Sequence, residues 1–255
     1  MQLTGKTALI TGSTSGIGLG IAQVLAEAGA DILLNGFGDP GPALQQIAAC
    51  GVKVAHHPAD LAQPAQIAEL FAWAAEHGGV DILLNNAGIQ HVAPIEQFAP
   101  EAWDSILAIN LSAVFHCTRL ALPGMRERGW GRIINIASVH GLVGSLGKVA
   151  YVAAKHGVIG LTKVVGLETA TSNVTCNALC PGFVLTPLVQ QQIDQRVSDG
   201  VDSQQAQQQL LAEKQPSGAF VTPRQLGELA LFLCSEGGAQ VRGAAWNVDG
   251  GWLAQ

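Results

Sequence analysis

Charge and phenol groups are scarce in this chain. Only 13% of its 255 residues are Lys, Arg, Asp or Glu, and Tyr151 is its single tyrosine. The net charge is −6 and there is no basic run, so neither nucleic acid nor an anionic membrane surface is expected as a partner. The lone phenol nevertheless lies between Lys148 and Lys155 in the sequence, which raises the question of what these three groups do together.

Long unbroken apolar stretches and a leader segment are also lacking. The uncharged stretch 170–193 is interrupted by Pro181, Pro187 and several polar residues, so no membrane span is expected. The N-terminus MQLTGKTALIT has no basic segment followed by a long apolar one, which argues against a signal peptide. Five cysteines, an odd number in apolar surroundings, predict reduced core residues of a cytoplasmic protein rather than a disulfide framework.

Hydrophobic residues are abundant, at 48% of the chain, and short apolar runs alternate with helical patterns. This alternation predicts an α/β fold: a single Rossmann-type domain over 1–255, with a doubly wound parallel sheet and helices on both faces. The expected strands are 6–11, 31–37, 53–57, 80–85, 131–137, 174–180 and 243–248. Ligands of such folds bind at the carboxyl ends of the strands.

One segment, 186–216, departs from the alternation because it is polar and rich in glutamine. Most of it is consistent with solvated helix. Because it follows directly on a predicted strand end, it also fits a small helical lid over the site. The two interpretations are compatible.

A glycine-rich turn, TGSTSGIG at 11–18, joins the first expected strand to the first expected helix. Gly12 allows a tight turn, Gly16 lets the backbone approach a pyrophosphate, and Gly18 lets the helix pack closely on the strand. The free N–H groups and the dipole of the helix attract phosphate. The turn therefore predicts a dinucleotide cofactor, although its spacing is GxxxGxG rather than GxGxxG.

The end of the second strand favours NAD over NADP. Dinucleotide folds often place an acidic residue there to bind the ribose hydroxyls, but this chain has NGF at 35–37. Residues 31–51 contain no Lys or Arg, so a 2′-phosphate would lack a charge partner in this loop. Asp60 and Leu61, after the third strand, are placed for the adenine, and Asp60 could also be a helix N-cap.

Six motifs in a fixed order extend this pattern along the chain. They are TGxxxGIG at 11–18, NNAG at 85–88, Asn110, Ser138, YxxxK at 151–155 and Pro181-Gly182. With them the sequence resembles the classical short-chain dehydrogenase/reductase family from about Leu3 to its end. The resemblance implies an NAD(P)-dependent oxidoreductase, a catalytic tetrad, and a homotetramer whose subunits pair through helices at 100–127 and 152–169 and through the C-terminal end.

The tetrad would consist of Asn110, Ser138, Tyr151 and Lys155. A free phenol has a pKa of about 10 and is a poor base near neutral pH. One helical turn separates Tyr151 from Lys155, so the ammonium can lie near the phenol oxygen and favour the phenolate. Tyr151 would take the hydroxyl proton of the substrate, and Ser138 would bind the substrate oxygen. The resemblance adds that Lys155 holds the nicotinamide ribose and that Asn110 anchors a water.

An unrelated Tyr/Lys pair on an exposed helix is the alternative, which Ser138, thirteen residues upstream of Tyr151, argues against. The resemblance also implies the cofactor contacts. They are Gly12, Thr14, Ser15, Gly16, Ile17, Gly18, Phe37, Asp60, Leu61, Asn86, Ala87, Gly88, Tyr151, Lys155, Pro181, Gly182, Val184 and Thr186.

Polar residues around the tetrad predict an acidic substrate. Lys148, His140 and Gln90 could together clamp a carboxylate, with an ammonium giving the charge and neutral donors fixing the orientation. A solvated loop lysine at 148 and a packing or capping histidine at 140 are the alternatives. His91 and His156 are expected to be structural.

Within the family, the segments NAGIQHVAPIE, SVHG, GKVAYVAAKHG and CPGFVLTPLV are similar to those of a bacterial group that oxidises D-3-hydroxybutyrate. This likeness implies that NAD oxidises (R)-3-hydroxybutyrate to acetoacetate, that Gln192 of the lid also binds the carboxylate, and that aromatic residues wall the methyl end. The implied substrate-binding residues are Gln90, Ser138, His140, Lys148, Tyr151, Phe183, Gln192 and Trp252. Val139 stands where the group often has alanine.

Other functions stay open. An NADPH-dependent 3-oxoacyl carrier-protein reductase would need basic residues near the ribose, and a polyol dehydrogenase would not need Lys148. A non-catalytic NAD sensor would have a broken tetrad. No metal is assigned: the seven histidines form no cluster with zinc-ligand spacing, and nothing requires the divalent cation that some relatives hold near the C-terminal Gln255.

Overall fold

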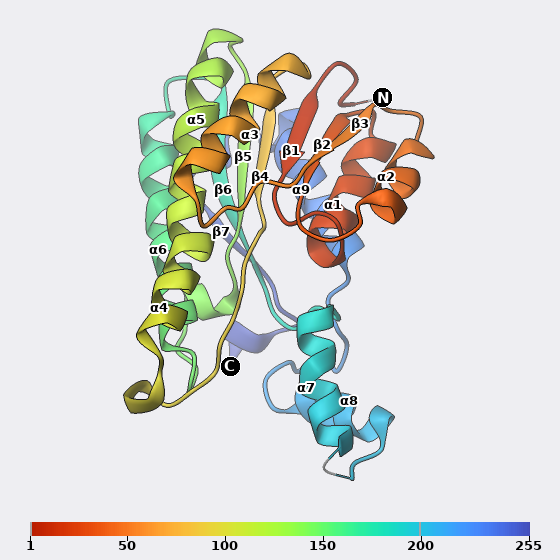
Figure 1. Ribbon diagram of the computed structural model, residues 1–255, viewed down its shortest axis with the longest axis vertical. Coiled ribbons are helices and arrows are strands. Elements are labelled where there is room, and N and C mark those ends of the chain that lie inside the picture. The colour runs from red at the N-terminus through yellow and green to blue at the C-terminus, as the bar shows by residue number, and fades with distance from the viewer. Residues whose placement is uncertain (1, 199) are drawn as a thin grey trace.

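The computed structural model describes residues 2–198 and 200–255, with the backbone alone at 187, 188, 191 and 192. These residues form a seven-stranded parallel sheet of order β3-β2-β1-β4-β5-β6-β7 (Figure 1). The strands are β1 (Thr7–Ile10), β2 (Asp31–Asn35), β3 (Val54–His57), β4 (Ile82–Asn85), β5 (Gly131–Ile136), β6 (Val174–Pro181) and β7 (Ala245–Val248). The predicted doubly wound sheet is confirmed, and its order reverses between β1 and β4.

Every strand differs from the prediction by one or two residues at an end, and the difference is two residues for β2, for β7 and for β4, which begins at Ile82 rather than at residue 80. β2 stops at Asn35 rather than continuing to residue 37, because Pro58 follows the last paired residue of β3 and has no N–H to extend the ladder. β7 begins at Ala245 rather than at Gly243, whose φ of +67° belongs to the left-handed region and not to a strand.

Helices cover both faces of the sheet. On one face lie α1 (Gly16–Glu27), α2 (Gly41–Ala48) and α9 (Pro223–Cys234); on the other lie α3 (Pro64–Glu76), α4 (Pro100–Leu107), α5 (Ala113–Glu127) and α6 (Val149–Glu168) (Figure 1). Successive side chains of a strand enter opposite cores. Thus Ala8 and Ile10 of β1 belong to the core that includes α1 and α9, while Leu9 belongs to the core that includes α3 and α5.

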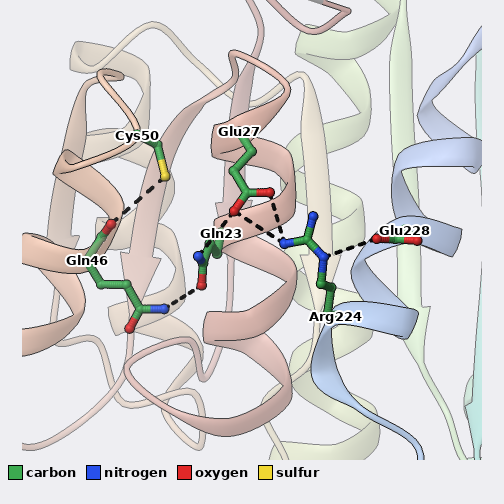
Figure 2. Close-up of polar contacts among 6 residues, drawn as sticks. All are labelled: Gln23, Glu27, Gln46, Cys50, Arg224 and Glu228. Carbon is green, nitrogen blue, oxygen red and sulfur yellow. Dashed lines mark hydrogen bonds and ion pairs between the residues drawn. The ribbon is translucent and has the colours of Figure 1, made fainter.

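Surface contacts supplement the packing of α1, α2 and α9. Gln46 of α2 donates to Gln23 of α1 at 2.6 Å, and Gln23 donates to Glu27 at 3.1 Å (Figure 2). Arg224 of α9 then pairs with Glu27 at 3.0 Å and with Glu228 at 3.1 Å. Exposed pairs of this kind contribute about 0–1 kcal/mol each, so the buried apolar faces chiefly hold this layer.

A π-helical turn, η2 (Ala108–Ser112), joins α4 to α5. The whole run Pro100–Glu127 is long and apolar enough to cross a membrane by length and composition alone. Core helices pass the same test, and α5 packs against β4, β5 and α3.

The segment predicted to form a lid contains two helices, α7 (Pro187–Ser198) and α8 (Ser203–Ala212), which lie apart from the helical layers (Figure 1). The Asp202 carboxylate caps α8 by accepting from the Gln204 and Gln205 N–H groups. Ile193 and Leu210 pack in a small separate core with residues that follow the carboxyl ends of β5, β6 and β7. Short helices complete the chain: η1 (Ile95–Gln97), η3 (Val139–Gly141), η4 (Glu236–Gly238) and η5 (Trp252–Ala254).

Candidate active site

A cavity of about 440 Å³ opens at the carboxyl ends of the strands, where the strand order reverses. Nearly all of the predicted cofactor and substrate residues line it. They are Gly12, Thr14, Ser15, Gly16, Ile17, Phe37, Asp60, Leu61, Asn86, Ala87, Gly88, Gln90, Ser138, His140, Lys148, Tyr151, Lys155, Pro181, Gly182, Phe183, Val184, Thr186 and Trp252. Gly18 and Asn110 lie behind the lining, and the Gln192 side chain falls outside the described residues.

The glycine turn has the shape of a cradle for a dinucleotide. Gly12 and Gly16 have φ values of +59° and +56°, and a Cβ on Gly12 would lie 2.9 Å from Cα of Ala87. The Asn86 side chain donates to the carbonyls of Thr11 and Gly12 at 2.9 and 2.8 Å, which locks the turn to the NNAG loop. Bare backbone therefore faces the cavity at the N-terminus of α1, as a pyrophosphate requires.

Gly18 has the packing role expected of it. A Cβ at this position would lie 2.5 Å from the Gly12 carbonyl oxygen. A side chain there would push α1 away from the turn, so Gly18 supports the cradle from behind.

At the end of β2, Asn35 is buried and does not take the place of a ribose-binding acid. Its side-chain amide donates to the carbonyls of His57 and Ala59, both at 3.0 Å. The exposed Phe37 instead forms the cavity wall at this end. Among the cavity-lining residues that the structure describes, the only Lys or Arg side chains are Lys148 and Lys155, which belong to the tetrad region.

Asp60 is not the N-cap of a helix, so that alternative is wrong. The helix α3 begins at Pro64, and Gln63 occupies its N-cap position. The Asp60 carboxylate instead accepts from the Ala62 N–H at 2.9 Å and closes the turn before the helix. Asp60 still lines the cavity, where its role toward adenine stays a prediction.

Three of the four tetrad residues come together where β5 ends and α6 begins. Ser138 follows β5, and its hydroxyl accepts from the His140 N–H at 3.1 Å. The buried Lys155 ammonium donates to the Ile136 carbonyl at 2.7 Å and lies 5.6 Å from the centroid of the Tyr151 ring. The end of the strand and the helix are thus tied together at the point where the chemistry is expected.

Asn110 supports the site from the π turn. Its side chain accepts from the Ile89 N–H and donates to the Ile89 carbonyl, both at 2.9 Å. The segment after NNAG, which leads to Gln90, is thereby held in place. The amide of this side chain thus has two backbone partners. The predicted water at Asn110 stays a prediction.

Burial shifts both titratable groups of the tetrad toward their neutral forms. It raises the pKa of the Tyr151 phenol, against which the Ser138 side chain acts. It lowers the pKa of Lys155 to about 8. The protein alone therefore keeps Tyr151 protonated at neutral pH, and a further positive charge in the cavity is needed to favour the phenolate.

The predicted carboxylate clamp combines a cation with a neutral donor. Burial, followed by the charges of Lys148 and Lys214, lowers the pKa of His140 to about 4, so its ring is neutral near pH 7. Burial also lowers the pKa of Lys148, which lines the cavity and is not a freely solvated loop lysine. The His140 ring packs edge-on against Trp252 at 5.4 Å, so a packing role and a binding role coexist.

Phe183 and Trp252 close one end of the cavity, with ring centroids 4.9 Å apart. The sequence gives no indication of two other residues near this wall. Lys214 is an exposed cation whose charge reaches His140, and Gln215 is a buried amide that accepts from the Phe183 N–H at 2.8 Å. Both follow a glutamine-rich helix, where no motif distinguishes them from their neighbours.

All five cysteines are free thiols, and only Cys50 is not fully buried. Within residues 2–198 and 200–255, no three His, Cys, Asp or Glu side chains gather into a group that could hold a metal ion.

The profile of the short chain dehydrogenase family matches residues 6–197, well over half of the chain. The chain belongs to this family. Among its short-chain dehydrogenase relatives, the D-beta-hydroxybutyrate dehydrogenases of Cupriavidus necator and Rhizobium meliloti are 61% and 53% identical to it. The match covers 100% of both chains in the first case, and 98% of this chain and 99% of the relative in the second.

Solved structures agree with this assignment. An actinorhodin polyketide ketoreductase variant determined with NADPH has a TM-score of 0.91 and 37% identity, over 99% of this chain and 98% of the other. The expected short-chain dehydrogenase fold is confirmed. A nicotinamide cofactor and an oxidoreductase activity follow for this chain from its family and the nucleotide-bound neighbour.

Proposed function

We propose that this short-chain dehydrogenase oxidises (R)-3-hydroxybutyrate reversibly to acetoacetate, with NAD as the hydride acceptor. The observation that carries the proposal is the position of Lys148 and neutral His140 in the same cavity as Ser138 and Tyr151. A secondary alcohol needs only the tetrad, whereas a cation beside it favours a substrate with a carboxylate. The names of the two relatives at 61% and 53% identity support the same substrate.

In the proposed complex each part of the substrate has its own partners. The carboxylate binds the Lys148 ammonium, with His140 and Gln90 as neutral donors. The C3 hydroxyl lies between Ser138 and Tyr151, and the methyl group contacts the wall of Phe183 and Trp252. A small hydroxy acid is then held at both ends, which fixes the face of C3 that loses hydride.

The bare backbone at Gly12 and Gly16 and the N-terminus of α1 would hold the cofactor pyrophosphate, and Lys155 the ribose next to the nicotinamide. Once bound, the cofactor supplies a hydride acceptor and, when oxidised, a positive charge. With that charge present, the Lys155 ammonium and the cofactor would together favour the phenolate of Tyr151, and Tyr151 would remove the hydroxyl proton. Ser138 donates a hydrogen bond to the substrate oxygen as its charge changes.

The charge distribution around the ribose end of the cavity supports NAD. A 2′-phosphate would meet Asn35, Gly36 and Phe37 and no cation, since residues 31–51 contain no Lys or Arg. The ketoreductase neighbour was solved with NADPH, so the preference needs a direct measurement. Loss of a charge-assisted contact costs about 1.5–3 kcal/mol, so kcat/KM is expected to be at least about tenfold higher with NAD than with NADP. Equal values would overturn the cofactor assignment.

The substrate assignment is tested with the purified enzyme, NAD and each enantiomer of 3-hydroxybutyrate, by following NADH absorbance. Oxidation of the R form alone is expected, together with reduction of acetoacetate by NADH. A reductase of acyl carrier-protein substrates would instead prefer an acetoacetyl thioester and NADPH. Oxidation of neither enantiomer, or a preference for an uncharged polyol, would reject the proposal.

A further inference from the structure

Three segments that are distant in sequence meet beneath the aromatic wall of the cavity. They are the start of the β6–α7 connection at Gly182-Phe183, the α8–α9 connection at 215–219, and the C-terminal turn at 249–252. The Ser217 N–H donates to the Gly250 carbonyl at 2.9 Å, which joins the second segment to the third.

Gln215 lies at the centre of this junction, and its side chain is 1% exposed. Its amide oxygen accepts from the Phe183 N–H at 2.8 Å, and its amide nitrogen donates to the Ala219 carbonyl. The side chain also fills the space left by two glycines. A Cβ on Gly182 would lie 2.5 Å from its Oε1, and a Cβ on Gly250 would lie 2.7 Å from its Cγ.

The backbone of Phe183 is fixed on both sides by this arrangement. Gln215 accepts from its N–H, and its carbonyl accepts from the Val221 N–H at 2.9 Å. The backbone from which the Phe183 ring projects is therefore held in place, and Trp252 packs against the ring with centroids 4.9 Å apart. Both rings share one core with Ile193 and Leu210 of the lid helices. A displacement of the two rings would therefore also displace the lid helices.

We infer that Gln215 is a positioning residue that sets the length of acyl chain the site accepts. It does not line the cavity and acts through Phe183, which with Trp252 closes one end of the cavity and which the proposed complex places against the methyl group. Without an acceptor, the buried N–H of Phe183 loses its partner and the wall relaxes to recover one. A relaxed wall admits the extra methylene groups that the native wall excludes. The inference rests on the proposed function.

The geometry requires one side chain that accepts and donates at the same time. Gln215→Met keeps nearly the same length and volume but provides neither group, so it removes the two hydrogen bonds with little change in packing. Gln208→Met is the matched control, because Gln208 lies on the exposed side of α8.

The test compares kcat/KM for (R)-3-hydroxybutyrate with that for (R)-3-hydroxyhexanoate, which carries two more methylene groups. One methylene in an apolar pocket changes discrimination about 10- to 200-fold, so the ratio is expected to fall at least about tenfold in Gln215→Met. The KM for NAD and the ratio of Gln208→Met should match the wild type.

A second measurement locates the effect at Phe183. In a Phe183→Ala background, adding Gln215→Met should leave the chain-length ratio unchanged, because the ring through which Gln215 acts is absent. A further fall in that background would overturn the inference, as would a wild-type ratio in Gln215→Met. An equal loss of activity on both substrates would also overturn it.

If Gln215→Met does not fold, Gln215→Asn withdraws the amide by one methylene and keeps its polarity. A smaller fall in the ratio is then expected, and an unchanged ratio would overturn the inference. A wild-type enzyme that does not oxidise (R)-3-hydroxybutyrate would refute the proposed function. A wild-type enzyme that does so, with unchanged ratios in the variants, would refute the role of Gln215 alone.

Discussion

At the scale of single residues, Lys148 and His140 divide the recognition of an anion between a charge and a neutral donor. Two cations side by side would repel each other and would each lose hydration in the cavity. Keeping His140 neutral, with a pKa of about 4, leaves one ammonium for one carboxylate. Selectivity for an acid is thus obtained without a buried cluster of positive charge.

Replacement of Lys148 tests this division directly. In Lys148→Ala the proposed clamp loses its cation, so KM for (R)-3-hydroxybutyrate should rise about 10- to 100-fold, in line with about 1.5–3 kcal/mol for a charged hydrogen bond. The KM for NAD should stay near the wild-type value, and Lys53→Ala, on the exposed part of the chain before β3, serves as the control. An unchanged substrate KM in steady-state kinetics would exclude the clamp.

The neutral state of His140 also has a consequence for stability. Its pKa is lowered from 6.5 to about 4 in the folded protein, so between these pH values the unfolded chain binds a proton that the folded chain does not. Stability must therefore fall as pH decreases through this window, by about 3 kcal/mol from this residue. In His140→Gln the loss on acidification should be smaller by this amount.

Urea unfolding at a series of pH values between 4 and 6.5 measures this difference. His156→Gln is the control, because His156 is an exposed histidine on the following helix, α6. The same acid dependence in His140→Gln and in the wild type would show that His140 is charged in the folded state.

At the scale of elements, the site depends on contacts between the ends of helices and strands. Lys155 ties α6 to the end of β5, and Asn110 ties the π turn to the segment after β4. A π turn adds one residue to a helix and is frequent at functional sites. Here it carries Asn110, whose side chain holds the Ile89 backbone through two hydrogen bonds.

Asn110→Leu should release that backbone. Two hydrogen bonds are lost and the Ile89 polar groups must find other partners, which predicts a loss of about 1–3 kcal/mol in the free energy of unfolding. Hydrogen exchange at the Ile89 amide should become faster, while that at the Thr11 amide, which bonds to Leu84, should not change relative to global unfolding. Unchanged protection of Ile89 would contradict this role for Asn110.

The elements could be predicted from the sequence where one local pattern determines them. β1, β4 and β6 are mostly apolar and are buried along their whole length, so their positions could be predicted to within one or two residues. The π turn could not be predicted, because one extra residue within a long apolar helical run leaves the pattern almost unchanged. The interpretation of Asp60 as a helix N-cap was wrong because α3 begins four residues later, at Pro64.

The residues of the site could likewise be predicted where they belong to a local sequence motif. Ser138, Tyr151 and Lys155 lie in motifs with fixed spacing, and the structure brings them into one cavity. Lys214 and Gln215 were missed because their relation to His140 and Phe183 exists only in the folded chain. A buried glutamine among exposed ones has no signature in a glutamine-rich segment.

At the scale of the whole molecule, apolar side chains remain exposed on two long helices. Phe115 of α5 is 50% exposed, and Val164 and Leu167 of α6 are 54% and 77% exposed. Scattered apolar residues need no explanation, but a group on adjacent helices of one face is typical of a subunit interface. These are the helices that the family resemblance assigns to subunit pairing, so we propose that they pair subunits in a homotetramer.

Introducing charge on this face tests the assembly. In Phe115→Glu/Leu167→Glu each interface would bury unpaired carboxylates on both sides of its symmetry axis, a cost of several kcal/mol per pair of subunits. Analytical ultracentrifugation should then find species smaller than the tetramer expected for the wild type. Leu146→Glu, at a residue that is 97% exposed outside these helices, should keep the wild-type mass. The substituted residues lie away from the cavity lining, so a dissociated enzyme that still oxidises substrate would show that each subunit contains a complete site. A wild-type mass for the double variant would instead place the interface on another face.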